Sequence, residues 1–199
     1  MLVRCIIAAF IGLLLSAVVN RVFRSKDAIP NRRTASMIIN AIIMAGSCSL
    51  FCYYYGFTYR FIIYTMLTVN LLYISNYDIR EQTVSFEMIA AAVVCALAVL
   101  IYNKDNIWWN YIVSGIGFTL IFVLVSRLTR GAIGIGDALI TGVIGLYLGF
   151  YQTLAVIIYA LFISGIVSLV LFIMKKVSRQ TPLPFAPFLT AGFLVSVLI

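Results

Sequence analysis

The chain has 199 residues, of which 64% are hydrophobic and only 10% are charged, and its formal net charge is +8. A soluble domain is about half apolar and about a quarter charged, so this composition excludes an ordinary soluble protein and indicates a polytopic membrane protein. Most of the 14 lysines and arginines lie in short segments between apolar runs, which is typical of membrane-protein loops and not of a nucleic-acid-binding surface.

Apolar runs close to the length of about 20 residues that spans a bilayer as a helix recur along the whole chain. Eight of them predict an all-α, multi-pass fold: Leu2–Asn20, Met37–Tyr55, Tyr59–Tyr77, Phe86–Tyr102, Tyr111–Leu128, Ile133–Phe150, Leu154–Met174 and Pro184–Ile199. The first run lacks a small-residue cleavage site after it, so we expect a membrane helix and not a removed signal peptide. Residues 1–199 are therefore expected to form a single integral membrane domain.

Eight helices would divide the basic residues unequally between the two sides of the membrane. One side collects eleven of them (Arg21, Arg24, Lys26, Arg32, Arg33, Arg80, Arg127, Arg130, Lys175, Lys176 and Arg179) and the other three (Arg4, Arg60 and Lys104). Lysine and arginine accumulate in cytoplasmic loops, so we expect the first side to be cytoplasmic, with both termini outside. The expected location is the inner or plasma membrane.

Nothing in the sequence predicts a soluble domain, a metal site or a cofactor. The longest polar stretch is Arg21–Ser36, in which Asp27, Pro30 and Asn31 are typical of a turn, and it is too short to fold alone. The chain has no histidine, which excludes histidine-based nucleophiles and metal sites. The four cysteines (Cys5, Cys48, Cys52 and Cys95) lie in apolar runs without a metal-binding spacing, so we interpret them as packing residues.

Two of the six acidic residues lie at the edges of apolar runs on the side expected to be cytoplasmic. Asp78 follows the third run, and Asp137 lies near the start of the sixth, where a charge is costly. Two neighbouring carboxylates share one proton, so one can act as a base on water while the other polarises a carbonyl. Such a pair titrates as a unit, which leaves the two roles unassigned. This arrangement predicts an aspartic hydrolase.

Glycines surround Asp137 on both sides. We expect Gly134 and Gly136 to let the backbone turn and a substrate backbone approach. Beyond Asp137 a face of small residues recurs at helical spacing (Ala138, Gly142, Gly145 and Gly149). Such faces allow close helix packing, and we expect this one to pack on a neighbouring helix, with Tyr59–Tyr77 as the candidate. The alternative is a packing seam in which Asp137 serves only as a helix N-cap.

Three prolines mark the start of the last apolar run, at Pro182, Pro184 and Pro187. They interrupt regular hydrogen bonding at membrane depth, which is tolerated where protein or a water-filled cavity meets the freed groups. We therefore count Pro184 and Pro187 with Gly134 and Gly136 as backbone features of a candidate active site. An ordinary helix that begins with proline is the alternative.

Together these motifs resemble the type IV prepilin peptidases. Gly134-Ile135-Gly136-Asp137 is similar to the G-x-G-D signature of that family, and Asp78 before Ile79-Arg80 is similar to its first catalytic aspartate. The stretch from Pro184 to Leu189 resembles P-F-G-P-F-L, and Ile11-Gly12 through Asn20-Arg21 resembles the family's first helix.

The resemblance implies a membrane aspartic endopeptidase, with Asp78 and Asp137 catalytic, that removes the basic leader of prepilins or pseudopilins at the cytoplasmic face. Larger members carry a methyltransferase insert with paired C-x-x-C motifs where this chain has only residues 21–36, so we expect no methyltransferase activity. The chain also departs from the family at Leu139, where a lysine is common, and at Val84-Ser85, where isoleucine-proline is common.

Two other functions stay open at this point. One is an intramembrane protease of the presenilin or signal-peptide-peptidase type, which also combines a Tyr-Asp pair with a G-x-G-D motif. Tyr77-Asp78 would be that pair here, and such an enzyme would cut inside a membrane span. A small transporter or assembly factor would use the acids for protons or packing, although the chain shows no internal repeat.

Overall fold

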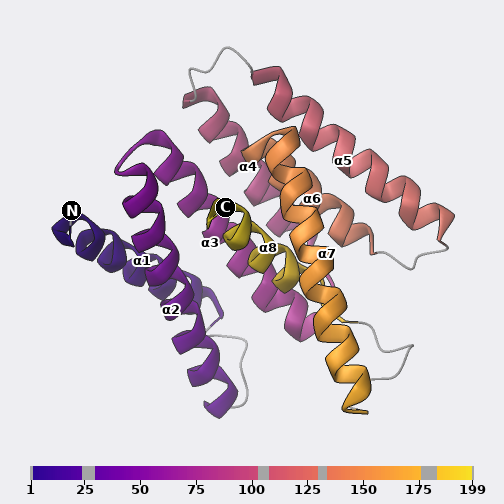
Figure 1. The fold of residues 1–199 in the computed structure, drawn as a ribbon, viewed down its shortest axis with the longest axis horizontal. Helices are drawn as coiled ribbons and strands as arrows, with labels where there is room; N and C mark the ends of the chain where they lie inside the picture. The colour runs from indigo at the N-terminus through magenta and orange to yellow at the C-terminus, as the bar shows by residue number, and fades with distance from the viewer. Residues whose placement is uncertain (1, 24–29, 103–107, 130–133, 176–182, 199) are drawn as a thin grey trace. The chain divides into compact units, whose positions relative to one another are not determined.

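The protein is described by a computed structural model that covers residues 2–23, 30–102, 108–129, 134–175 and 183–198. Within these ranges every regular element is an α-helix (Figure 1). The helices are α1 (Leu2–Phe23), α2 (Pro30–Tyr55), α3 (Tyr59–Glu81), α4 (Phe86–Tyr102), α5 (Trp108–Leu128), α6 (Ile135–Leu148), α7 (Phe150–Ile173) and α8 (Ala186–Leu198). The all-α fold predicted from the apolar runs is confirmed.

Several helices extend beyond the predicted apolar runs, and two of these extensions matter for the site and the loop before it. Helix α3 continues one turn past its apolar run, so Asp78 lies inside a helix and not in the loop that follows it. Helix α2 begins at Pro30, because the fixed φ angle of proline suits the first helical position. The expectation that Pro30 and Asn31 mark a turn is therefore wrong, and Asp27 lies outside the described residues.

Helices α6 and α7 meet at a single residue, Gly149, whose φ angle of 75° lies in the left-handed region. A Cβ at this position would also lie 2.5 Å from the side-chain nitrogen of Asn110. Because glycine satisfies both constraints, α7 starts at Phe150, earlier than the apolar run Leu154–Met174 suggested.

Four helices, α1, α2, α5 and α7, are long and apolar enough to cross a membrane by length and composition. Helices α4, α6 and α8 are apolar but shorter. With 14 and 13 residues, α6 and α8 extend roughly 20 Å at a rise of about 1.5 Å per residue, whereas the hydrocarbon core is about 30 Å thick. The membrane class is confirmed, and the number of eight spans stays a prediction.

The chain divides into two compact units, Met1–Asn76 and Tyr77–Ile199. In the first unit a chain of side-chain hydrogen bonds links three helices. Asn40 in α2 donates to the oxygen of Asn20 in α1 (2.9 Å), and Asn76 in α3 donates to the oxygen of Asn40 (3.0 Å). Ser36 in turn donates to the oxygen of Asn76 (2.9 Å). Such bonds join helices where water is scarce.

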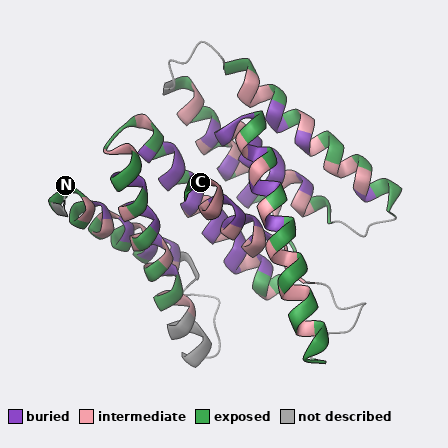
Figure 2. Ribbon diagram, viewed as in Figure 1, coloured by how far each residue is buried: buried purple, intermediate pink, exposed green. Residues whose placement is uncertain are grey.

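In the second unit the small-residue face of α6 packs against α5. A Cβ on Gly145 would lie 2.8 Å from the backbone nitrogen of Gly115, and a Cβ on Gly142 would collide with the hydroxyl of Thr119. Figure 2 shows that α6 is mostly buried, whereas much of α7 is exposed. The expectation that this face packs on the third helix is wrong, because α5 supplies the matching glycine.

The α5–α6 contact predicts opposite effects for two glycine-to-alanine substitutions. Gly145→Ala presses a methyl group into the backbone of α5, so we expect a loss of about 1–3 kcal/mol of stability. Gly117→Ala on α5 is the matched control, since a Cβ there meets nothing within 4 Å and alanine favours helix by about 1 kcal/mol. Thermal unfolding of the detergent-solubilised protein measures both. Equal midpoints for the two variants would contradict the close α5–α6 contact.

Candidate active site

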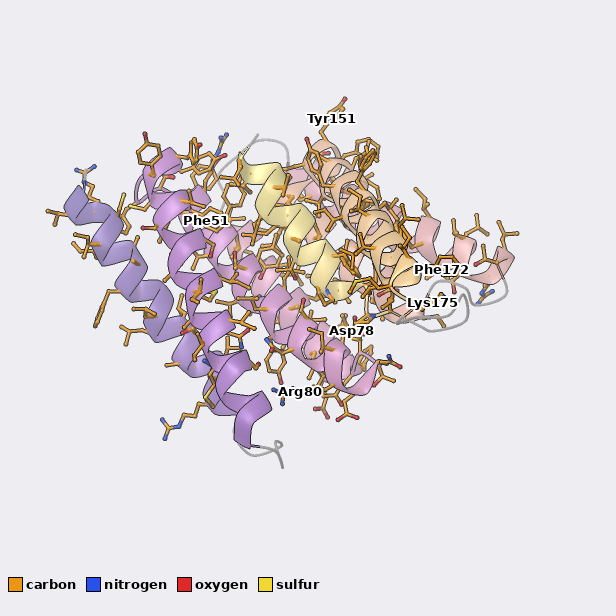
Figure 3. The ribbon with its side chains drawn as sticks, turned by 60° about the horizontal axis from the view of Figure 1, so that its bottom comes forward. Phe51, Asp78, Arg80, Tyr151, Phe172 and Lys175 are labelled. Atoms are coloured by element: carbon orange, nitrogen blue, oxygen red, sulfur yellow. The ribbon has the colours of Figure 1, made fainter. Side chains whose placement is uncertain are left out.

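Asp78 lies in the last turn of α3, and its side chain is only 6% exposed. The backbone N–H of Ala186, the first residue of α8, donates to Oδ2 of Asp78 over 3.1 Å. The N–H of Phe185 donates to the same carboxylate. Figure 3 shows Asp78 beside α8. An acid at the end of one helix is therefore held by the backbone at the start of another.

The start of α8 explains why these two N–H groups are available. The first N–H groups of a helix have no partner within the helix, and proline has none to offer, so Pro187 leaves a gap directly after Ala186. The next two residues already bond within the segment, since the N–H groups of Phe188 and Leu189 donate to the carbonyl of Phe185. A proline frees a carbonyl and not an N–H, so the role expected of Pro184 and Pro187 in the site stays a prediction. Pro182 lies outside the described residues.

Asp137 lies in the first turn of α6 and is partly buried. Gly134 is the N-cap of that helix, and its backbone N–H donates to the Asp137 carboxylate. This is one half of a capping box, in which an acid at the third helical position reaches back to the N-cap. Asp137 is thus not the N-cap itself, which corrects the alternative interpretation of the motif.

The structure brings the carboxylates of Asp78 and Asp137 near enough for their charges to interact. They come from helices that lie far apart in the sequence, and both belong to the second compact unit. Burial raises the pKa of the Asp78 carboxyl, and the N–H groups of Ala186 and Phe185 oppose that shift because they favour the charged form. A charge on one of the two carboxylates therefore disfavours a charge on the other.

The two glycines of the motif differ in what requires them. Neither has a φ angle in the left-handed region, so the turn itself does not demand glycine. A Cβ on Gly136 would lie 2.9 Å from Cγ2 of Val84, in the segment between α3 and α4, whereas a Cβ on Gly134 would make only ordinary contacts. Gly136 is therefore needed for the close approach of Val84. Residues 130–133 before the motif lie outside the described residues.

Sequence reasoning missed two contributors to this site. The N–H donors of Phe185 and Ala186 carry no side-chain signature, and the proline spacing around them is the signal that could have indicated them. Val84 was noted only as a departure from the family pattern. Leu139, the other departure, is partly buried in α6.

Among the residues that the structure describes, no three histidine, cysteine or acidic side chains group as metal ligands.

The chain is similar in sequence to known leader peptidases. The model of the type IV leader peptidase family matches residues 65–173, more than half of the chain. A prepilin leader peptidase/N-methyltransferase of Bacillus subtilis (strain 168) is 28% identical over 103 residues, which cover 52% of this chain and 41% of that protein. The matched region thus spans less than half of the relative's length. No solved structure matches the chain.

The contact between Gly136 and Val84 predicts a rescue. Gly136→Ala forces a methyl group against a β-branched side chain with little rotamer freedom, so we expect thermal stability in detergent to fall. Val84→Ala in the same chain should restore most of the loss, with a coupling energy of about 1 kcal/mol in a double-mutant cycle. Gly134→Ala is the control and should leave the midpoint nearly unchanged. Additive effects of the Gly136 and Val84 substitutions would show that the contact is not what excludes a side chain at Gly136.

Proposed function

The chain belongs to the type IV leader peptidase family, and on that premise we propose that it is a membrane-embedded aspartic endopeptidase. Its substrates would be prepilin or pseudopilin-like precursors, from which it removes the leader peptide at the cytoplasmic face of the plasma or inner membrane. The observation that carries the proposal is the electrostatic contact between the carboxylates of Asp78 and Asp137.

The proposed reaction uses one proton held by the pair. The ionised carboxylate accepts a proton from a water molecule, whose oxygen attacks the scissile carbonyl carbon. The protonated carboxyl gives its proton to the carbonyl oxygen, which forms a tetrahedral gem-diol. One carboxyl then protonates the amide nitrogen as the carbon–nitrogen bond breaks, while the other carboxylate takes a proton from a hydroxyl of the gem-diol. The products are a leader with a free carboxyl end and a mature protein with a free amine, and the pair again holds one proton.

Two helix starts support this chemistry. Helix α8 begins beside Asp78, and Asp137 lies in the first turn of α6. The N-terminus of a helix carries a partial positive charge, equivalent to roughly half a unit. Both starts therefore stabilise negative charge on a pair that burial would otherwise keep neutral.

The substrate must be recognised despite a repulsion between charges. Prepilin leaders are basic, and the side of this chain expected to be cytoplasmic is basic too. We propose that the apolar segment of the precursor docks between membrane helices, while the two acids supply local negative potential. Leu139, two residues beyond Asp137 in α6, would then contact the substrate where other family members commonly have a lysine.

The proposed activity is peptidase activity without methyl transfer. Helix α1 ends at Phe23 and α2 begins at Pro30, so little chain lies between them. The relative named as a peptidase/N-methyltransferase is matched over only 41% of its length. Incubation with a labelled methyl donor tests this separately from cleavage.

The dyad is tested by isosteric removal of each charge. In proteoliposomes with a precursor that has a basic leader and an apolar helix, Asp78→Asn and Asp137→Asn should each reduce cleavage at least about 10³-fold, because the pair acts as one unit. Glu87→Gln, at an exposed acid in the first turn of α4, is the control and should cleave normally. Mass spectrometry of the product locates the cut. Full cleavage by either aspartate variant would overturn the proposed function.

A further inference from the structure

The two acids of the site have unequal surroundings. Asp78 accepts two backbone N–H groups, from Phe185 and Ala186, and its side chain is 6% exposed. Burial works against a charge on this residue, and the two donors are the groups that compensate for it. A carboxyl group that was neutral at this position would weaken both bonds, since hydrogen bonds to an ionised acceptor are roughly twice as strong.

Asp137 has less support for a charge. It accepts one backbone N–H, from Gly134, and this bond lies within its own helix start. By surface area it is the more exposed of the two acids, which by itself favours a charge on it. The positive end of α6 acts on Asp137 and that of α8 acts on Asp78, but the negative end of α3 also acts on Asp78, which lies in its last turn. What favours a charge on Asp78 is the number of N–H groups that donate to it.

Few other charged groups lie on the described elements that pack around the two acids; α5, which packs on α6, carries Arg127 in its last turn. Helix α8 and the segment 82–85 contain no titratable residue, and α6 adds only Tyr147, near its far end. Around Asp78, α3 contributes Tyr77, Arg80 and Glu81; α4 contributes the exposed Glu87. The charge that bears on Asp137 is that of Asp78 itself.

Resting on the proposed peptidase function, we propose that the single proton of the pair resides on Asp137 and that Asp78 is the ionised member. The N–H groups of Phe185 and Ala186 would hold Asp78 in this state. Asp78 then takes the proton from the attacking water, and Asp137 gives its proton to the carbonyl oxygen of the substrate. The proline-rich start of α8 is thereby a positioning element that decides which acid is the base.

Removal of one donor tests the assignment. Ala186→Pro deletes the N–H that bonds Asp78, at a first helical position where proline is favoured. Loss of that bond raises the pKa of Asp78, so the acidic limb of the cleavage rate should move to higher pH by about one unit. Ala186→Gly keeps the N–H and is the matched control, and its acidic limb should stay in place whatever its rate. An unchanged limb in Ala186→Pro overturns the assignment.

A second measurement does not need an active variant. A hydrophobic carbodiimide adds to protonated carboxyl groups, so at neutral pH it should modify Asp137 and spare Asp78 in the unaltered protein, as mapped by peptide mass spectrometry. In Ala186→Pro, modification of Asp78 should increase several-fold. Preferential modification of Asp78, or equal modification of both acids, in the unaltered protein overturns the assignment.

The two proposals fail in different ways. If Asp78→Asn still cleaves the precursor, the peptidase dyad itself is wrong. If both aspartates are essential but Ala186→Pro changes neither the acidic limb of the pH–rate profile nor the pattern of carbodiimide modification, only the proton assignment is wrong.

Discussion

The hydrogen bond from the Ala186 N–H to the Asp78 carboxylate is the contact on which the rest of the site depends. A carboxylate with 6% exposure needs a partner, because an unpaired buried charge is costly by several kcal/mol. The described residues offer it two main-chain donors at a helix start. The hydrogen bond thus joins the last turn of α3 to the start of α8 through a polar group in an apolar chain.

The second acid is positioned by packing. Helix α6 packs against α5 at Gly145, where it meets the backbone of Gly115, and at Gly142, which leaves room for the hydroxyl of Thr119. At its start, Val84 presses on Gly136, one residue before Asp137. The Asp137 side chain folds back to the N–H of Gly134. The G-x-G-D motif is therefore a helix start in which one glycine is the N-cap and the other allows a neighbour to approach.

Sequence reasoning could predict the helices because apolar runs of membrane length are a strong signal, and it could single out Asp78 and Asp137 because charges are rare in such runs. It missed what depends on tertiary contacts. The partner of the α6 glycine face is α5 and not the third helix, since spacing describes one helix and says nothing about which helix faces it. The donors to Asp78 are main-chain groups, which every residue except proline carries, so only Pro184 and Pro187 hinted at them.

The central claim is that Asp78 and Asp137 form one site, and a short bifunctional thiol reagent tests it most directly. The four native cysteines would be replaced by alanine, and Asp78→Cys and Asp137→Cys introduced together into protein in native membranes. The geometry predicts that a single reagent molecule bridges the two new thiols, which mass spectrometry detects as one bridging adduct and no free thiol. Two separate adducts, one on each cysteine, would contradict a shared site.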